Sequence, residues 1–185
     1  GTGTIANDDA ATITITGPAA TAEGNAGNTP VEFTVTLSAP SDVPISVNFQ
    51  TKDGTATVAG NDYSPTTGQV TFEAGKSGTI KIPVNILGDT TVENDETFSV
   101  LIDALDAGAP ARNVTIQTDT ASATITNDDS ATITLTPVAQ DEGNAGTKNM
   151  VFTATLSNPV DGDVTVDFAT TDGTATTANN DYTET

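Results

Sequence analysis

Apolar residues occupy every second position in seven separate segments of the chain. In the segment Val31–Leu37, for example, Val, Phe, Val and Leu alternate with Glu and Thr. A period of two is typical of a β-strand with one buried and one solvated face. The seven segments are Ile13–Ile15, Val31–Leu37, Val43–Phe49, Val70–Phe72, Ile80–Ile86, Phe98–Ile102 and Ala121–Ile125.

Turn residues such as Asp53-Gly54 and Gly75-Lys76 separate these segments, and no stretch has a helical period. Two antiparallel sheets packed face to face would bury all seven apolar faces. We therefore predict an all-β fold, a seven-strand antiparallel β-sandwich. Few hydrophobic residues combined with high net charge can also indicate disorder, but the regular alternation argues against that interpretation.

The sequence repeats itself at a spacing of about 120 residues. Four short motifs each occur twice at nearly the same offset: Asn-Asp-Asp, Glu-Gly-Asn-Ala-Gly, Asp-Gly-Thr-Ala-Thr and Asp-Tyr. Chance matches would not share an offset, so we predict a tandem repeat. The chain then divides into the last-strand tail of an upstream repeat, a complete repeat, and the first half of a following repeat, at residues 1–9, 10–129 and 130–185.

The half repeat lacks the strands that would cover the apolar faces of its three strand-like segments, which are Ile133–Leu135, Met150–Leu156 and Val164–Phe168. Three strands with one exposed apolar face are marginally stable. We expect this part to be frayed, or to pair with another copy of the chain by strand exchange.

Composition restricts the chemistry. The chain has 25 acidic and five basic residues, no His and no Cys. A net charge of -20 disfavours nucleic acid and anionic membrane surfaces as partners and favours cations. No apolar run is long enough for membrane insertion. Without His, Cys or Trp, the chain lacks the usual catalytic nucleophile pairs and sugar-stacking aromatics, so we predict that it is not an enzyme.

Many of the carboxylates lie at strand ends. In a chain whose strands alternate in direction, the first–second, third–fourth and fifth–sixth turns and the end of the seventh strand share one end of the sandwich. Seven carboxylates lie in those segments: Glu23, Asp62, Asp89, Glu93, Glu96, Asp128 and Asp129.

Carboxylates gathered at one end repel each other, and a hard cation would relieve that repulsion. Ca²⁺ accepts about six to eight oxygen ligands in flexible geometry, whereas Mg²⁺ prefers strict octahedral sites and zinc favours Cys or His. Calcium is therefore the predicted cofactor. The alternative, that these are ordinary solvated turn acids, stays open.

Four short motifs follow one another in order, within Thr51–Tyr63, Gly68–Gly75, Ile86–Phe98 and Ala123–Asp129. Together they resemble the Calx-beta domain, which occurs in sodium–calcium exchangers and in extracellular adhesion proteins. The resemblance implies an immunoglobulin-like sandwich with Ca²⁺ at one tip, and it places the same seven carboxylates at the ligand positions. Two departures, Gly88 before a single Asp89 and Asn127 in place of a third closing Asp, reduce the ligand set, so we expect one to three ions.

In the half repeat, Glu142 and Asp181 match ligand positions but the remainder of the site is missing. We expect this second site to be incomplete unless another chain completes it.

The resemblance indicates a calcium-binding structural or adhesion repeat of a large extracellular or cell-surface protein. Its partners would be calcium, the neighbouring repeats and a cell-surface or matrix partner that the sequence does not identify. Calcium at the tip would stiffen the repeat and its junction. Two alternatives remain: a regulatory calcium-sensor domain and a calcium-free spacer repeat.

Overall fold

The computed structural model describes residues 1–4, 7–108 and 111–185. Within these residues the chain forms eleven β-strands and no helix. None of the described residues therefore belongs to a membrane-spanning helix. The strands are β1 Ala11–Thr16, β2 Thr21–Ala22, β3 Gly27–Leu37, β4 Ile45–Asp53, β5 Thr67–Phe72, β6 Gly78–Gly88, β7 Glu96–Asp106, β8 Val114–Thr118, β9 Thr120–Thr126, β10 Ile133–Thr136 and β11 Thr153–Leu156.

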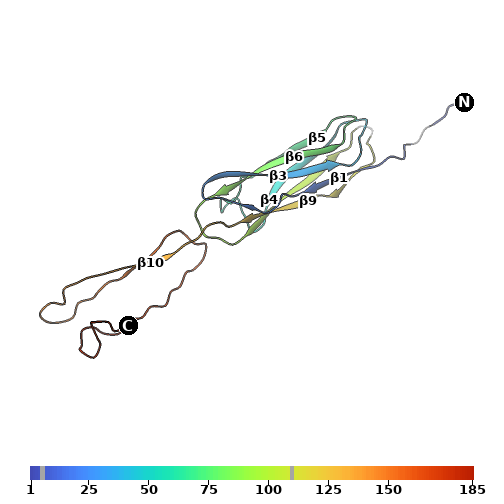
Figure 1. Ribbon diagram of the computed structural model, residues 1–185. Coiled ribbons are helices and arrows are strands. Elements are labelled where there is room, and N and C mark those ends of the chain that lie inside the picture. Colours follow the sequence, from blue (N-terminus) through green and yellow to red (C-terminus); the bar gives the residue numbers. More distant parts are fainter. Residues whose placement is uncertain (5–6, 109–110) are drawn as a thin grey trace.

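Strands β1–β9 build a sandwich of two sheets (Figure 1). One sheet has the order β6-β3-β1-β8 and the other the order β2-β9-β7-β4-β5. The predicted all-β sandwich is thus confirmed. The seven predicted segments all form strands, but β2 and β8 raise the count in this unit to nine.

The two additional strands have different causes. β8 carries a short alternation of Val114 and Ile116 with polar residues, which lies outside the seven predicted segments. β2 has two residues and is too short to show any period. β8 and β9 are separated by Asp119 alone, so the chain passes directly from one sheet to the other at this point.

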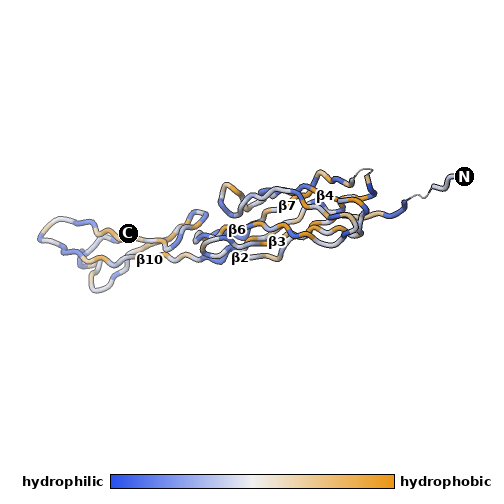
Figure 2. The backbone as a smooth tube through the Cα atoms, turned by 90° about the horizontal axis from the view of Figure 1, so that it is seen from above, coloured by the Kyte–Doolittle hydropathy of each residue, from blue (hydrophilic) through white to orange (hydrophobic). Residues whose placement is uncertain are grey.

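The core is formed by the inward faces of the two sheets. β1 and β3 alternate buried and less buried residues along their length, as a period of two requires. Three rings lie at its centre: Phe98 stacks on Tyr63 at 4.3 Å between centroids and meets Phe33 edge to face at 5.8 Å. Figure 2 shows the apolar positions recurring along the strands of the sandwich.

Strand direction alternates from β2 to β8, whereas β1 and β2, and likewise β8 and β9, run in the same direction. β1 is antiparallel to β3, β3 to β6, β4 to both β5 and β7, and β7 to β9. The β2–β3, β4–β5 and β6–β7 loops and the end of β9 therefore lie at one end of the sandwich. We call this end the acidic tip.

Residues 130–185 extend beyond the acidic tip (Figure 1). Here β10 and β11 form a two-stranded antiparallel pair, and the third predicted segment, around Val164–Phe168, is not a strand. Its counterpart β4 is paired on both sides, by β5 and β7, and the described residues of this half offer no such partners. Apolar side chains are consequently exposed; Phe168 is 79% exposed. Pairing with a second copy by strand exchange stays a prediction.

Candidate metal centre

Two groups of three carboxylates meet at the acidic tip. Within each group, one oxygen from every carboxylate lies within 4.8 Å of the others. The first triad is Glu23, Asp128 and Asp129, and the second triad is Asp62, Glu93 and Glu96. Six of the seven carboxylates predicted from the sequence are therefore brought together, but in two clusters.

The first triad joins the β2–β3 loop to the end of β9. Glu23 and Asp129 are buried, with 4% and 8% of their surfaces exposed, whereas Asp128 is exposed. Gly24 donates its backbone N–H to Oδ1 of Asp128 at 3.1 Å, and Asn25 Nδ2 donates to Oδ1 of Asp129 at 2.8 Å. The buried Oδ2 of Asp129 has no hydrogen-bond partner. An unpaired buried carboxylate oxygen is costly, so this atom indicates a position where a positive charge is needed.

The second triad joins the β4–β5 loop to the start of β7. Oδ2 of Asp62 accepts a 2.6 Å hydrogen bond from the Thr57 backbone N–H, which fixes the carboxylate within its loop. Glu93 and Glu96 are half-buried. Glu96 is the first residue of β7, so the sheet fixes its backbone.

The two triads are separate in space but electrostatically coupled. Burial, followed by the charges of Glu93 and Asp89, raises the pKa of Glu23 to about 7. Burial and then Asp62 raise the pKa of Glu96 to about 7. The pKa of Glu93 is raised by burial and by carboxylates of both triads. The acidic tip therefore resists full ionisation unless a cation compensates the charge.

The three remaining predicted residues lie outside the triads. Asp89 is exposed, and its Oδ1 accepts a 2.6 Å hydrogen bond from the Thr91 N–H; its charge nevertheless acts on both triads. In the half repeat, Glu142 and Asp181 are exposed. Neither belongs to a carboxylate cluster in the described part of the chain, and Oδ2 of Asp181 accepts from the Thr176 N–H at 2.9 Å.

The two sequence departures have structural causes. Oδ1 of Asn127 accepts from the Glu93 N–H at 3.1 Å, and its Nδ2 donates to the Asp129 carbonyl at 3.0 Å. An Asp could accept the first bond but could not donate the second, so only an amide at this position links the Glu93 N–H to the Asp129 carbonyl. At Gly88, a Cβ would lie 2.0 Å from the Gly24 carbonyl oxygen, so an Asp there would force the backbone to shift.

The sequence did not reveal the roles of three residues at the tip. Asn25 and Asn127 support the triads through the hydrogen bonds described above. Asp161 comes from the half repeat, and its charge raises the pKa of both Glu93 and Glu96. The repeated Glu-Gly-Asn motif was the available signal for Asn25, whereas nothing in the sequence placed Asp161 near the tip.

Comparisons with known proteins support the same fold. The chain resembles the crystal structure of an apo-form Calx CBD1 domain, with 22% identity and a TM-score of 0.54, covering 65% of this chain and all of that one. It resembles CBD12 from CALX1.2 at 24% identity and a TM-score of 0.51, covering 64% of this chain and 44% of that one. For a Calx CBD2 domain the values are 19% identity, a TM-score of 0.51, and 63% and 86% coverage.

No curated protein sequence matches the chain. The sequence model of the Calx-beta domain, however, matches residues 7–129 and 134–185, which is most of the chain. Together with the sandwich and the acidic tip, this match assigns the protein: it belongs to the Calx-beta domain family.

Proposed function

We propose that the acidic tip binds Ca²⁺ and that the protein is a calcium-binding structural repeat of a larger extracellular or cell-surface adhesion protein. The observation that carries the proposal is the buried Oδ2 of Asp129, which has no hydrogen-bond partner and lies among like charges. A cation at this point would satisfy the oxygen and offset the repulsion at once.

The residues fit calcium better than other metals. The carboxylate oxygens of each triad lie within 4.8 Å of one another, close enough to share one ion at calcium–oxygen distances of about 2.4 Å. The side-chain ligands of both triads are carboxylate oxygens, and the chain has no His or Cys. Neither ion pair of the described residues, Lys81–Glu32 or Arg112–Asp42, involves a tip carboxylate, so no basic side chain in these pairs competes for the site.

The triads define which residues would hold an ion. The first triad would hold one through Glu23, Asp128 and Asp129, and the second through Asp62, Glu93 and Glu96. Asp89, whose charge acts on both triads, could supply a further carboxylate ligand to either ion. The ion supplies positive charge. Because each triad joins loops distant in the sequence, an ion there would fix the loops relative to one another.

Two features support a structural rather than a sensing role. The acidic tip lies where the chain leaves the sandwich for residues 130–185, so rigidity at the tip affects the junction (Figure 1). The repeated sequence motifs support a tandem array. Extracellular calcium modules bind with a Kd of about 10⁻⁴ to 10⁻³ M, a range that suits permanently filled sites outside cells.

Thermal unfolding of the chain in millimolar Ca²⁺, in Mg²⁺ and in chelator tests the proposal. Calcium in hundredfold excess over its Kd should stabilise the fold by about 2.7 kcal/mol. The gain should be absent in a Glu93→Ala/Asp129→Ala double variant. A Glu73→Ala/Asp119→Ala variant removes the same charge away from both triads and should keep the gain. An equal effect of Mg²⁺, or no effect of Ca²⁺ on the wild-type chain, would overturn the proposal.

A further inference from the structure

The β6–β7 loop touches a turn of the half repeat. The turn, residues 157–162, directly follows β11. Val92 donates its backbone N–H to the Pro159 carbonyl at 3.0 Å, and Asp161 donates its N–H to the Val92 carbonyl at 3.0 Å. These two bonds form a parallel β-bridge between Val92 and Val160, which are both half-buried. The complete unit and the following half repeat therefore meet through backbone hydrogen bonds.

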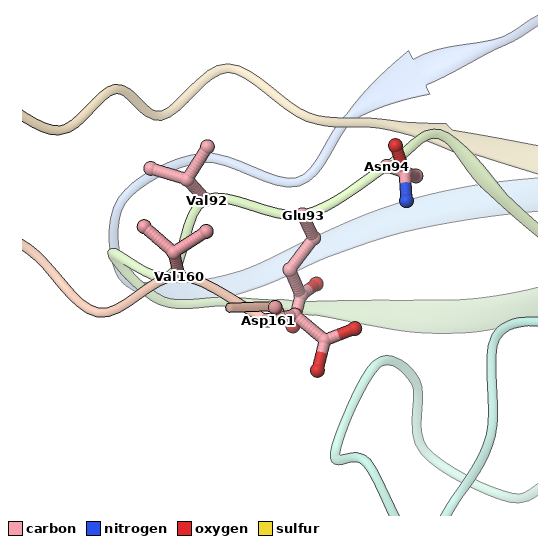
Figure 3. A pocket seen from close by; sticks show the side chains of 6 residues that line it. Val92, Glu93, Asn94, Val160 and Asp161 are labelled. Carbon is pink, nitrogen blue, oxygen red and sulfur yellow. The ribbon is translucent and has the colours of Figure 1, made fainter. Parts of the chain in front are cut away.

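The contact places a further carboxylate at the second triad. A small pocket between the two segments is lined by Val92, Glu93 and Asn94 on one side and Val160, Asp161 and Gly162 on the other. Figure 3 shows the carboxylates of Glu93 and Asp161 close to each other in this pocket. The pocket lining contains no basic residue. The two segments are thus joined by backbone hydrogen bonds, whereas the like charges of Glu93 and Asp161 repel each other.

The turn has a defined local structure of its own. Thr132 donates its N–H to Oγ of Ser157, and Ser157 donates its N–H to the Thr132 carbonyl, each at 2.9 Å. Thr12 and Ser38 make the same two bonds in the complete unit, at 2.8 and 3.0 Å. A preformed turn loses little conformational entropy when it docks.

The same acidic turn is present in the complete unit. The sequence Leu37-Ser38-Ala39-Pro40-Ser41-Asp42 aligns with Leu156-Ser157-Asn158-Pro159-Val160-Asp161 at the offset of the repeated motifs. Asp42 lies in the β3–β4 turn, at the end of the sandwich opposite the acidic tip, and pairs with Arg112. Each unit therefore carries an acidic residue at the end that faces its predecessor.

We propose that the 157–162 turn docks on the β6–β7 loop in a cation-dependent manner, with Asp161 sharing a divalent cation with Glu93. This inference rests on the proposed calcium binding and specifies how an ion couples two successive units. Without the cation, Asp161 opposes Glu93 and the two backbone hydrogen bonds open. With the cation bound, both carboxylates contact the same ion and the two backbone hydrogen bonds stay formed.

Amide hydrogen exchange of the whole chain, measured by NMR, tests the docking directly. The Val92 and Asp161 amides report the contact, and the Ser157 amide reports the fold of the turn itself. Calcium in place of chelator should slow exchange of the first two by about tenfold or more and leave Ser157 nearly unchanged. In Asp161→Asn, exchange of the Val92 amide should no longer depend on calcium. Asp163→Asn, which removes an equal charge two residues away, should behave as wild type.

The outcomes separate this inference from the proposed function. If calcium raises the unfolding midpoint but leaves exchange at Val92 and Asp161 unaltered, the docking inference fails and calcium binding stands. An Asp161→Asn variant with the calcium dependence of the wild type would also overturn it. If calcium alters neither the midpoint nor the exchange, the proposed function fails, and the inference fails with it.

Discussion

The hydroxyl of Tyr63 donates a 2.5 Å hydrogen bond to Oδ1 of Asp53, across the loop that follows β4. Tyr182 makes the equivalent bond to Asp172 in the half repeat, at 2.8 Å. In the complete unit the Tyr63 ring is buried against Phe98, and burial together with Asp53 raises the pKa of Tyr63 to about 12. The bond thus links the hydrophobic core to the loop that carries Asp62.

Tyr63→Phe should lower the free energy of unfolding by about 1.5–3 kcal/mol, because it removes a buried hydrogen bond to a charged acceptor and keeps the ring stacking. Urea unfolding monitored by circular dichroism measures the change. Tyr182→Phe is the matched control; Tyr182 is half-buried and its unit lacks the opposing sheet, so the transition of the sandwich should not move. Equal loss in both variants would contradict this account.

Asp129→Asn should have opposite effects with and without calcium. In chelator the midpoint should rise, because a charge is removed from a crowded, buried position whose pKa is raised by burial and then by Asp128. In calcium the midpoint should fall below that of the wild type, because a ligand is lost. Differential scanning calorimetry in the two conditions measures both shifts. Midpoints that move in the same direction would argue against an ion at the first triad.

The stability of the calcium-free protein should fall as the pH rises from about 4.5 through about 7. Glu23 and Glu96 have folded-state pKa values of about 7, above the ordinary value of 4.5. Between these values the folded state keeps protons that the unfolded state has released, so raising the pH favours unfolding. Below about 4.5 both states are protonated and the contribution is fully present.

Urea unfolding in chelator across this pH range measures the slope, and Glu23→Gln should make it less steep. Calcium should reverse the trend, because only ionised carboxylates bind the ion and its affinity increases with pH. A chelator profile that is identical in wild type and Glu23→Gln would contradict the raised pKa of Glu23.

Gly88→Asp, which introduces the acidic residue that the family pattern has before Asp89, should not improve calcium binding. Its Cβ would lie 2.0 Å from the Gly24 carbonyl oxygen and 2.7 Å from that of Glu23, so the backbone of the first triad must move. We expect a loss of about 1–3 kcal/mol in stability. Thr90→Asp adds the same charge at an exposed position and should be tolerated. Isothermal titration with calcium and urea unfolding distinguish the two variants.

The shared end of the loops could be predicted from the sequence because it depends only on strand direction. Alternating directions bring Glu23, Asp62 and Asp128 to one end whichever sheet each strand joins. The division into two triads could not be predicted, because it depends on which strands are neighbours across the two sheets. β2 escaped prediction because two residues carry no period.

Asp161 could not be predicted for a different reason. Its place beside Glu93 is set by backbone hydrogen bonds between the complete unit and the half repeat. The alternation of apolar and polar residues within one unit carries no information about such a contact. Asn127 was interpreted as a missing ligand, whereas its amide holds together the segments that carry Glu93 and Asp129. A single sequence does not show whether an Asn in place of an Asp merely removes a metal ligand or adds hydrogen bonds that hold the neighbouring segments.

The direct passage from β8 to β9 determines how the unit would respond to tension. The chain enters at one end of the sandwich and leaves at the other (Figure 1). β1 pairs in parallel with β8, and β2 pairs in parallel with β9, so the first two strands of the unit are hydrogen-bonded to the last two. A pull on the two ends slides these strands along each other and loads their hydrogen bonds simultaneously, in shear. Such a clamp fails only when the bonds break together, whereas a hairpin pulled open at its end unzips one bond at a time.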